Sequence, residues 1–317
     1  MSFDISALFR PGLPAPAAAP FTTFPRYNFV GGHNDSDGVP YVGVRLGDDG
    51  IDMAHLVDVL EAQKQAGTPV KFIYTIPTVQ NPTGSVMPIA QRCEMLDIAA
   101  RYGGLIFEDD CYADVVWTGE RPPTMRAMDA EAAKAEGRAN RVIYCGSFSK
   151  SVAPALRIGF IMADWPVIAQ ILPLKTDAGT GALDQMVLAE FCQAHFAEHI
   201  VVLRARLKAK CDITIQALEE NFGTSAEFRA PQGGIFIWVT LPETVDTTRL
   251  GQVAMQDGIA INPGAEWTVN GAKNRNRMRL CFGHPGEDEI KEGIARLAAI
   301  CHREFGVPER ISNSAQT

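Results

Sequence analysis

The sequence lacks any pair of cysteines at a metal-binding or redox spacing. Its seven cysteines are scattered singly, with no C-x-x-C pattern and an odd total, so we expect reduced thiols without a disulfide framework. Basic residues are also scarce, because 29 Lys and Arg stand against 37 Asp and Glu, giving a net charge of −8 and a pI near 5.3. This charge predicts no nucleic-acid partner and no binding to an anionic membrane surface.

Long apolar runs are missing as well. The best candidate for a membrane span, residues 157–175, is interrupted by Asp164, Pro166 and Pro173. The N-terminus has no basic patch followed by an apolar core, so no secretory signal is visible. From the sequence we therefore expect no membrane segment and a cytoplasmic protein.

What is present is the composition of a globular protein of about two domains, with 317 residues of which 46% are hydrophobic. Residues 1–40 are rich in Pro, Ala and Gly and predict an extended N-terminal arm. Residues 41–195 are expected to form a large domain, and residues 196–317 a smaller one.

The large domain alternates short β-rich runs with helical patterns. The runs predict strands, and apolar residues at helical spacing predict helices between them. The expected strands are 41–46, 71–76, 105–109, 141–147 and 157–163, and the expected helices are 53–66 and 88–102. This order favours an α/β fold with a mainly parallel sheet that is flanked by helices.

The C-terminal part has a different pattern. A long helical stretch reaches about residue 222, with an expected break near 196–199. Strands are predicted at 234–241, 259–263 and 277–282, before a closing helix at 287–303. These elements predict a smaller α+β domain.

Polar residues gather where the predicted parallel strands end, which is where open α/β sheets bind ligands. The first such strand runs into the turn 81–84 (Asn-Pro-Thr-Gly), and the next ends in Asp109, three residues before Tyr112. The strand after it is followed by Ser147 and Lys150. Each feature alone is ordinary, but their order along neighbouring strands predicts a ligand site.

Five stretches together carry a resemblance to a known family. They are YTIPTVQNPTG (74–84), FEDDCY (107–112), GSFSKSVAPALRIGF (146–160), PQGGIFIWV (231–239) and MRLCFG (278–283). The chain resembles the class I and II aminotransferases, pyridoxal-phosphate enzymes of fold type I, over about residues 41–305. The similarity is greatest to the branch of 2-aminoadipate, aromatic and kynurenine-type aminotransferases.

The resemblance implies roles around the cofactor ring. Lys150 would bind pyridoxal 5′-phosphate as a Schiff base and then move the proton between the substrate α-carbon and the cofactor. Asp109 would keep the pyridine nitrogen protonated, so that the ring accepts electrons. Asn81 and Tyr112 would hydrogen-bond the phenolic oxygen of the ring.

The resemblance also implies how the charged ends are held. Ser147 and Arg157 would bind the cofactor phosphate. Arg279, beside Asn81, would clamp the substrate α-carboxylate, a task for which the planar guanidinium suits better than an amine. Arg275 and Arg277 are nearby alternatives for this clamp.

The implied activity is ping-pong transfer of an amino group from an L-amino acid to a 2-oxo acid, in a homodimer. A carboxylate clamp favours transamination over decarboxylation, because the carboxylate is retained.

One departure from the family is serious. Residues 24–40 resemble the family's N-terminal arm, and residues 41–52 resemble its third strand and the turn beyond that strand. In this chain the two stretches are joined directly near Pro40-Tyr41. The family has two strands, a phosphate-binding turn and a ring-stacking aromatic residue between them, and these are missing here. The alternative function is therefore an impaired or inactive paralogue that at most binds the cofactor or a ligand.

Two further motifs and architectures are disfavoured by the sequence. His195 and His199 match the zinc pattern H-x-x-E-H, but a helix break is expected there and no third ligand is distinguishable, so we predict no metal. Some bacterial regulators contain aminotransferase-like domains behind a helix-turn-helix domain, for which an arm of 40 residues rich in proline is too short.

Overall fold

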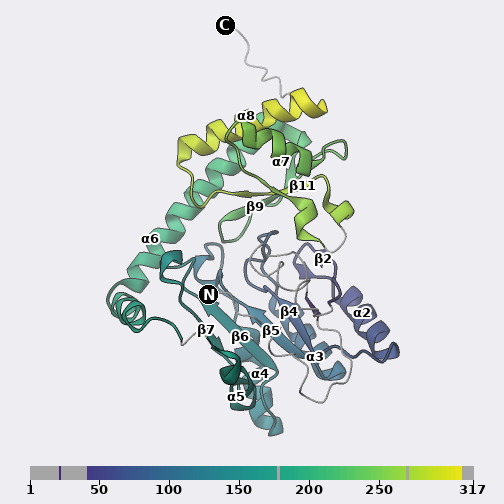
Figure 1. Cartoon of the computed structure of the whole chain (residues 1–317), viewed down its shortest axis with the longest axis vertical. Helices are drawn as coiled ribbons and strands as arrows, with labels where there is room; N and C mark the ends of the chain where they lie inside the picture. The colour runs from purple at the N-terminus through teal and green to yellow at the C-terminus, as the bar shows by residue number, and fades with distance from the viewer. Residues whose placement is uncertain (1–20, 23–40, 177–178, 269–270, 309–317) are drawn as a thin grey trace. The chain divides into compact units, whose positions relative to one another are not determined.

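The computed structural model describes residues 21–22, 41–176, 179–268 and 271–308. The chain forms two compact units (Figure 1). Unit 1 comprises Met1–Gln80 and Ser85–Leu203, and unit 2 comprises Asn81–Gly84 and Arg204–Thr317. The N-terminal arm expected at 1–40 lies outside the described residues, apart from strand β1.

A five-stranded sheet in the order β1-β4-β5-β6-β7 forms the centre of unit 1 (Figure 1). Its first four strands run parallel and β7 is antiparallel to β6, which agrees with the predicted, mainly parallel sheet. The strands are β1 (Phe21–Thr22), β4 (Phe72–Thr75), β5 (Leu105–Asp109), β6 (Val142–Ser147) and β7 (Gly159–Met162). Within the described residues, β7 is the last strand and has no partner on its outer edge.

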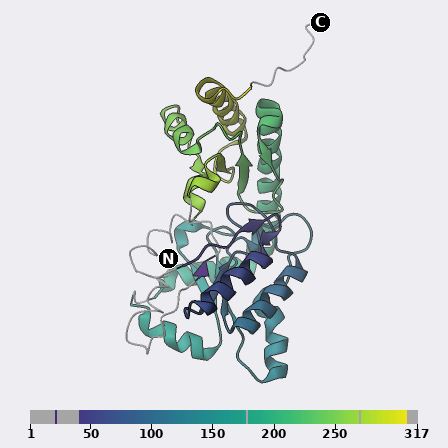
Figure 2. The same ribbon diagram turned by 90° about the vertical axis from the view of Figure 1, so that its right-hand side faces the viewer.

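Helices α2 (Met53–Gln65), α3 (Ile89–Tyr102) and α4 (Met125–Glu136) cover one face of this sheet, and α2 lies beside α3 (Figure 2). Local sequence sets their ends. The side chain of Asp52 accepts a hydrogen bond at the start of α2, and Gly103 ends α3 in the left-handed conformation that glycine adopts without strain.

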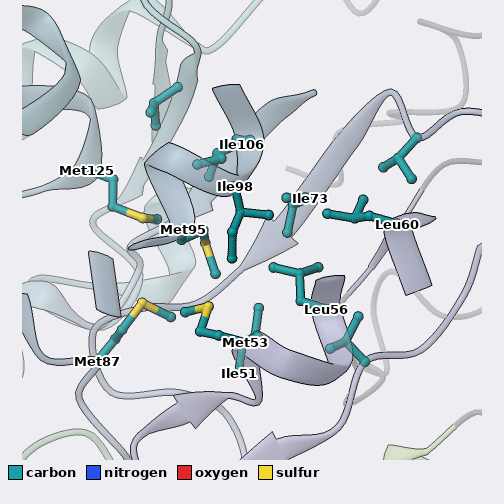
Figure 3. Packing of buried hydrophobic residues seen from close by; sticks show 14 residues of the cluster. Ile51, Met53, Leu56, Leu60, Ile73, Met87, Met95, Ile98, Ile106 and Met125 are labelled. Atoms are coloured by element: carbon teal, nitrogen blue, oxygen red, sulfur yellow. The ribbon is translucent and has the colours of Figure 1, made fainter. Parts of the chain in front are cut away.

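Between these helices and the sheet lies the main hydrophobic core (Figure 3). Leu56 of α2, Met95 and Ile98 of α3, and Ile73 and Ile106 of the sheet are all at most 1% exposed. Burial of each such side chain contributes about 1.5–3 kcal/mol. The core therefore fixes β4 and β5, whose ends carry the residues of interest.

The opposite face of the sheet has a second cluster, in which Phe72, Phe107 and Ile143 are buried. The helix α5 (Trp165–Ile171) packs there through Val167. Side chains alternate between the two faces along each strand, so Asp109, two residues after Phe107, lies on the face of this second cluster.

Two predictions about elements were wrong. The segment 41–46 is not a strand: only Leu46–Gly47 (β2) pairs, with Gly50–Ile51 (β3), in a tight antiparallel hairpin. Gly50 has φ +123°, which requires glycine and favours a turn over a continuing strand. The break expected near 196–199 is absent, because α6 (Ala182–Phe222) runs through it continuously.

Helix α6 is apolar over much of its length and runs through the boundary between the units. One window of 18 residues has a mean hydropathy of 1.3, so by length and composition alone the helix could cross a membrane. This corrects the expectation that no such run exists, and 11% of the window is buried. Leu183, Met186, Val187 and Val201 are each more than 60% exposed on it.

Unit 2 contains a four-stranded antiparallel sheet in the order β10-β11-β9-β8. Its elements are β8 (Glu227–Phe228), β9 (Phe236–Thr240), α7 (Thr247–Gln256), β10 (Asn262–Pro263), β11 (Arg277–Cys281) and α8 (Glu287–Phe305). The predicted strands and closing helix are thus present. Six short 3₁₀ helices complete the described chain: η2 (Ala113–Val115), η3 (Pro154–Leu156), η4 (Leu172–Leu174), η5 (Gly223–Ser225), η6 (Gly264–Trp267) and η7 (Gly271–Asn274).

Candidate active site

The carboxyl ends of β5 and β6 bring several predicted residues of unit 1 to one edge of the sheet. Asp109, the last residue of β5, pairs with Cys145 of β6. Ser147 ends β6 two residues later, and Lys150 follows in the next turn. Neighbouring parallel strands end at the same edge, so a carboxylate, a hydroxyl and an amine are collected there.

The carboxylate of Asp109 is held by hydrogen bonds. The Tyr74 hydroxyl donates to Asp109 Oδ2 at 2.6 Å, and Cys111 also bonds the carboxylate. Burial raises the pKa of Asp109, and the bonds from Tyr74 and Cys111 oppose that rise by stabilising the ionised form. The group is thus a partly desolvated carboxylate, suited to pair with a cation.

Lys150 lies in a compact turn after β6. The backbone N–H of Ser149 donates to Ser147 Oγ at 3.2 Å, and the hydroxyls of Ser147 and Ser149 bond each other at 3.1 Å. The Lys150 ammonium acts electrostatically on the Cys111 thiol, and so does Asp109. Lys150 and Asp109 thus both lie near Cys111.

Ser147 ends β6, and Arg157 lies between the short helix η3 and β7, the strand that pairs with β6. Ser147 lies opposite Gly159 in the register of β6 and β7, and Arg157 stands two residues before Gly159. Arg157 has φ +53°, an uncommon conformation for a residue with a side chain. Its guanidinium donates to the Pro154 carbonyl at 3.1 Å and is exposed, so it can still take an anionic ligand.

Tyr112 is buried, whereas a side chain that contacts a ligand is normally accessible to it. Its side chain is fully buried, at 0% exposure, where it precedes the short helix η2. It is one of the largest fully buried side chains of the described chain. The structure therefore gives Tyr112 a packing role, and its predicted bond to the cofactor stays a prediction.

The remaining predicted pair, Asn81 and Arg279, belongs to unit 2. Arg279 Nη1 donates to Asn81 Oδ1 at 2.8 Å, and Nη2 donates to Asn262 Oδ1 at 2.8 Å. The guanidinium carbon lies 3.8 Å from the ring centre of Phe236 and 4.3 Å from that of Trp267. Together these contacts hold a planar cation in one orientation, as a carboxylate clamp requires.

The two alternative arginines are bound elsewhere. Arg275 Nε donates to Asp246 Oδ2 at 3.0 Å, and Arg277 Nη1 donates to Asn274 Oδ1 at 3.3 Å; both of these bonds are exposed. Of the three arginines, Arg279 alone has the aromatic and amide surroundings described above. Those surroundings were not found from the sequence, because residues far apart along the chain supply them.

A buried arginine that sequence reasoning missed supports the turn containing Asn81. Arg92 of α3 is 0% exposed and lies 3.9 Å from Glu108 Oε1. Its guanidinium donates four hydrogen bonds, to the carbonyls of Pro77, Met87 and Pro123 and to Thr78 Oγ1, at 3.0–3.1 Å. It thereby ties together the two ends of the segment 77–87.

Glu108 precedes Asp109 but points to the opposite face. It is 0% exposed, and its carboxylate accepts hydrogen bonds from the backbone N–H groups of Met125 and Arg126 at 2.8 and 3.0 Å. Burial raises its pKa to about 7, against the lowering effect of these bonds. Glu108 is thus a structural group that joins α4 to the sheet.

The histidines of the zinc pattern contact other groups. His199 Nε2 lies 2.9 Å from the Ser151 carbonyl oxygen, and the Phe191 ring packs against both His195 and His199. In the described part of the chain, no three His, Cys, Asp or Glu side chains gather as metal ligands would.

The model of the family "Aminotransferase class I and II" matches residues 23–297. The chain belongs to this family. The class I and II aminotransferases are pyridoxal-phosphate enzymes, and the fold is that of their fold type I.

The family member aromatic-amino-acid aminotransferase 1 of Thermococcus litoralis is 34% identical over 268 residues, which are 84% of this chain and 62% of that protein. A multiple substrate aminotransferase from Thermococcus profundus has a TM-score of 0.85 and 31% identity, with 95% of this chain and 72% of that one covered. The Pyrococcus horikoshii kynurenine aminotransferase, solved in complex with PMP, has a TM-score of 0.83 at 32% identity, over 95% of this chain and 73% of that one.

This aminotransferase-family chain thus spans about three fifths of the length of the curated relative described above. Parts of the relatives have no counterpart in it. The position of the omitted block, near Pro40-Tyr41, falls at the edge of the described residues and stays a prediction.

The donors of unit 1 fit the cofactor of the family. Pyridoxal phosphate carries an aldehyde, a basic ring nitrogen and a phosphate. An amine (Lys150), a carboxylate (Asp109), and a hydroxyl with a guanidinium (Ser147, Arg157) are the matching partners for these three groups. They are collected at the strand ends where α/β proteins bind ligands.

Proposed function

We propose that this chain binds pyridoxal phosphate at the strand ends of unit 1 and transfers an amino group from an L-amino acid to a 2-oxo acid. The observation that carries the proposal is the placement of Asp109 at the end of β5, with Lys150 in the turn after the adjacent β6. Family membership adds the expectation of this cofactor.

When bound, the cofactor supplies an electron sink that stabilises negative charge at the substrate α-carbon. Each protein group then has a definite task. Lys150 would hold the cofactor at its aldehyde group, and its amine would carry the proton from the substrate α-carbon. Asp109 would pair with the ring nitrogen, and Ser147 and Arg157 would bind the phosphate.

Arg279 is proposed to bind the α-carboxylate of the substrate. Its guanidinium is oriented by Asn81 and Asn262 and lies against two aromatic rings. The donor amino acid is proposed to be aromatic or an aminoadipate-like acid, on the basis of the names of relatives that act on such compounds.

The chain is further proposed to form a homodimer. Support comes from α6, where Leu183, Met186 and Val187 are exposed apolar side chains at the i, i+3 and i+4 spacing of one helix face. Light scattering of the purified protein tests this: a dimer mass is expected, and a monomer mass at all accessible concentrations would contradict it.

The test of function is an absorption spectrum of the protein mixed with pyridoxal phosphate, with and without borohydride. We expect a visible band that borohydride bleaches, and a reduced adduct on the peptide containing Lys150. Lys150→Ala should lack both, whereas Lys134→Ala, which removes an exposed lysine of α4, should keep them.

Amino-group transfer is then measured with 2-aminoadipate, aromatic and branched-chain donors and 2-oxoglutarate. Turnover with at least one donor is expected. A soluble, folded protein without the visible band would overturn the proposal and favour the inactive paralogue. The band without turnover would keep cofactor binding and overturn catalysis.

A further inference from the structure

Tyr74 has no role in the proposal above, yet its side chain bonds directly to the carboxylate of Asp109. Its hydroxyl lies 2.6 Å from Asp109 Oδ2. That distance is typical of an O–H donor bonded to an ionised acceptor. Tyr74 therefore stabilises the ionised form of the Asp109 carboxylate.

The sheet holds Tyr74 in this position. Tyr74 pairs with Phe107 in the parallel register of β4 and β5, and the two rings stack at 5.8 Å with an angle of 28° between planes. Asp109 is two residues beyond Phe107 on the same face, so it lies diagonally across from Tyr74. The phenol cannot turn away without losing the ring contact.

Several other groups also act on Asp109. From its own strand end come Asp110, whose charge opposes ionisation, and Cys111, which donates to the carboxylate. Cys145 of β6 feels the charge of Asp109, and Lys150 acts on the adjacent Cys111. Burial is the largest influence and raises the pKa of Asp109, while the largest opposing influence is the bond from Tyr74.

We infer that Tyr74 is a positioning residue, which keeps Asp109 ionised and fixes its carboxylate for pairing with the protonated ring nitrogen of the cofactor. The inference deepens the proposed function and rests on it for the cofactor. A protonated Asp109 carries no charge to pair with the ring cation, so loss of the phenol should weaken that pairing.

The test compares wild type with Tyr74→Phe, Asp109→Asn and the double variant. Tyr74→Phe keeps the ring that packs on Phe107, and circular dichroism checks the fold. Tyr102→Phe is the matched control: it removes a hydroxyl that donates to Glu61 Oε2, and neither residue is among the groups that act on Asp109.

The first measurement uses the cofactor-free protein. A carbon-13 NMR titration of the Asp109 carboxyl should show a higher pKa in Tyr74→Phe than in wild type, and no change in Tyr102→Phe. The second measurement is the affinity for pyridoxal phosphate by equilibrium dialysis. Tyr74→Phe should lower it about tenfold near neutral pH, and by more at acidic pH than at alkaline pH.

The double variant separates positioning from general structure. In the Asp109→Asn background, Tyr74→Phe should change the affinity no further, because the carboxylate through which it acts is gone. An equal loss in both backgrounds, or an unchanged Asp109 titration, would overturn the inference. If the wild type itself binds no cofactor, the proposed function is overturned, and so is the part of the inference that concerns pairing with the cofactor. The titration still decides whether Tyr74 lowers the pKa of Asp109.

Discussion

Replacement of Arg92 by methionine should destabilise unit 1 strongly. Methionine keeps much of the aliphatic volume but removes the charge and all four of the hydrogen bonds donated by Arg92. It also leaves Glu108 buried without its cation, which lies 3.9 Å away in the wild type. Loss of one partner of a buried ion pair costs about 3–5 kcal/mol, and the orphaned carbonyls place the expected loss at the upper end of that range.

The assay is urea-induced unfolding followed by circular dichroism, with amide exchange of β4 and β5 as the probe of unit 1. Arg101→Met, an exposed change in the last turn of the same helix, is the control and should stay within about 0.5 kcal/mol of wild type. Adding Glu108→Gln to Arg92→Met should restore part of the loss, because no buried charge then remains.

The cost of Arg92→Met should also depend on pH. It should be larger at alkaline pH, where Glu108 is ionised, than at acidic pH, where Glu108 is protonated. A loss no larger than that of Arg101→Met, or one that Glu108→Gln leaves untouched at every pH, would refute the reasoning.

Three further predictions concern single residues. Gly84→Ala should destabilise the protein by about 1–3 kcal/mol more than Gly67→Ala in urea unfolding. Both glycines have φ +72°, but a Cβ at Gly84 would lie 2.7 Å from Pro231 Cβ, whereas nothing lies within 4 Å of a Cβ at Gly67. Equal losses of stability in the two variants would contradict this prediction. Protonated Glu108 stabilises the fold fully below its ordinary pKa of 4.5, and this stabilisation is lost as pH rises through about 7. Glu108→Gln should therefore reduce the change in the free energy of unfolding over this pH range by about 3 kcal/mol. An unchanged pH dependence of unfolding would count against a raised pKa of Glu108. Arg279→Lys should lower kcat/KM for the amino-acid donor by about tenfold to a hundredfold, because an ammonium cannot bind the carboxylate bidentately; unchanged steady-state kinetics would exclude Arg279 as the clamp.

The strand ends could be predicted from the sequence because their signals are local. The buried runs that became β5 and β6 end at Asp109 and Ser147, within a residue of where they were expected. Parallel order then follows from the helices between the strands. The position of Asp109 and Ser147 at the ends of neighbouring strands was therefore predicted correctly, and their roles toward the cofactor stay predictions.

The supporting residues could not be predicted in this way. Arg92 stands in an amphipathic helix, where an arginine is normally exposed, and only the folded segment 77–87 shows why it is buried. The partners of Arg279 come from four separate segments of the chain, and the hydroxyl of Tyr74 bonds a carboxylate 35 residues away. Tertiary contacts of this kind leave no periodic mark in the sequence.

The aromatic and amide contacts around Arg279 have a thermodynamic consequence. A free arginine side chain has about 2 kcal/mol of rotamer entropy, which a ligand must normally overcome to fix it. Here Phe236, Trp267 and Asn262 already confine the guanidinium within the folded unit. The conformational entropy of the Arg279 side chain is therefore already lost on folding. A carboxylate that binds Arg279 binds a preorganised guanidinium.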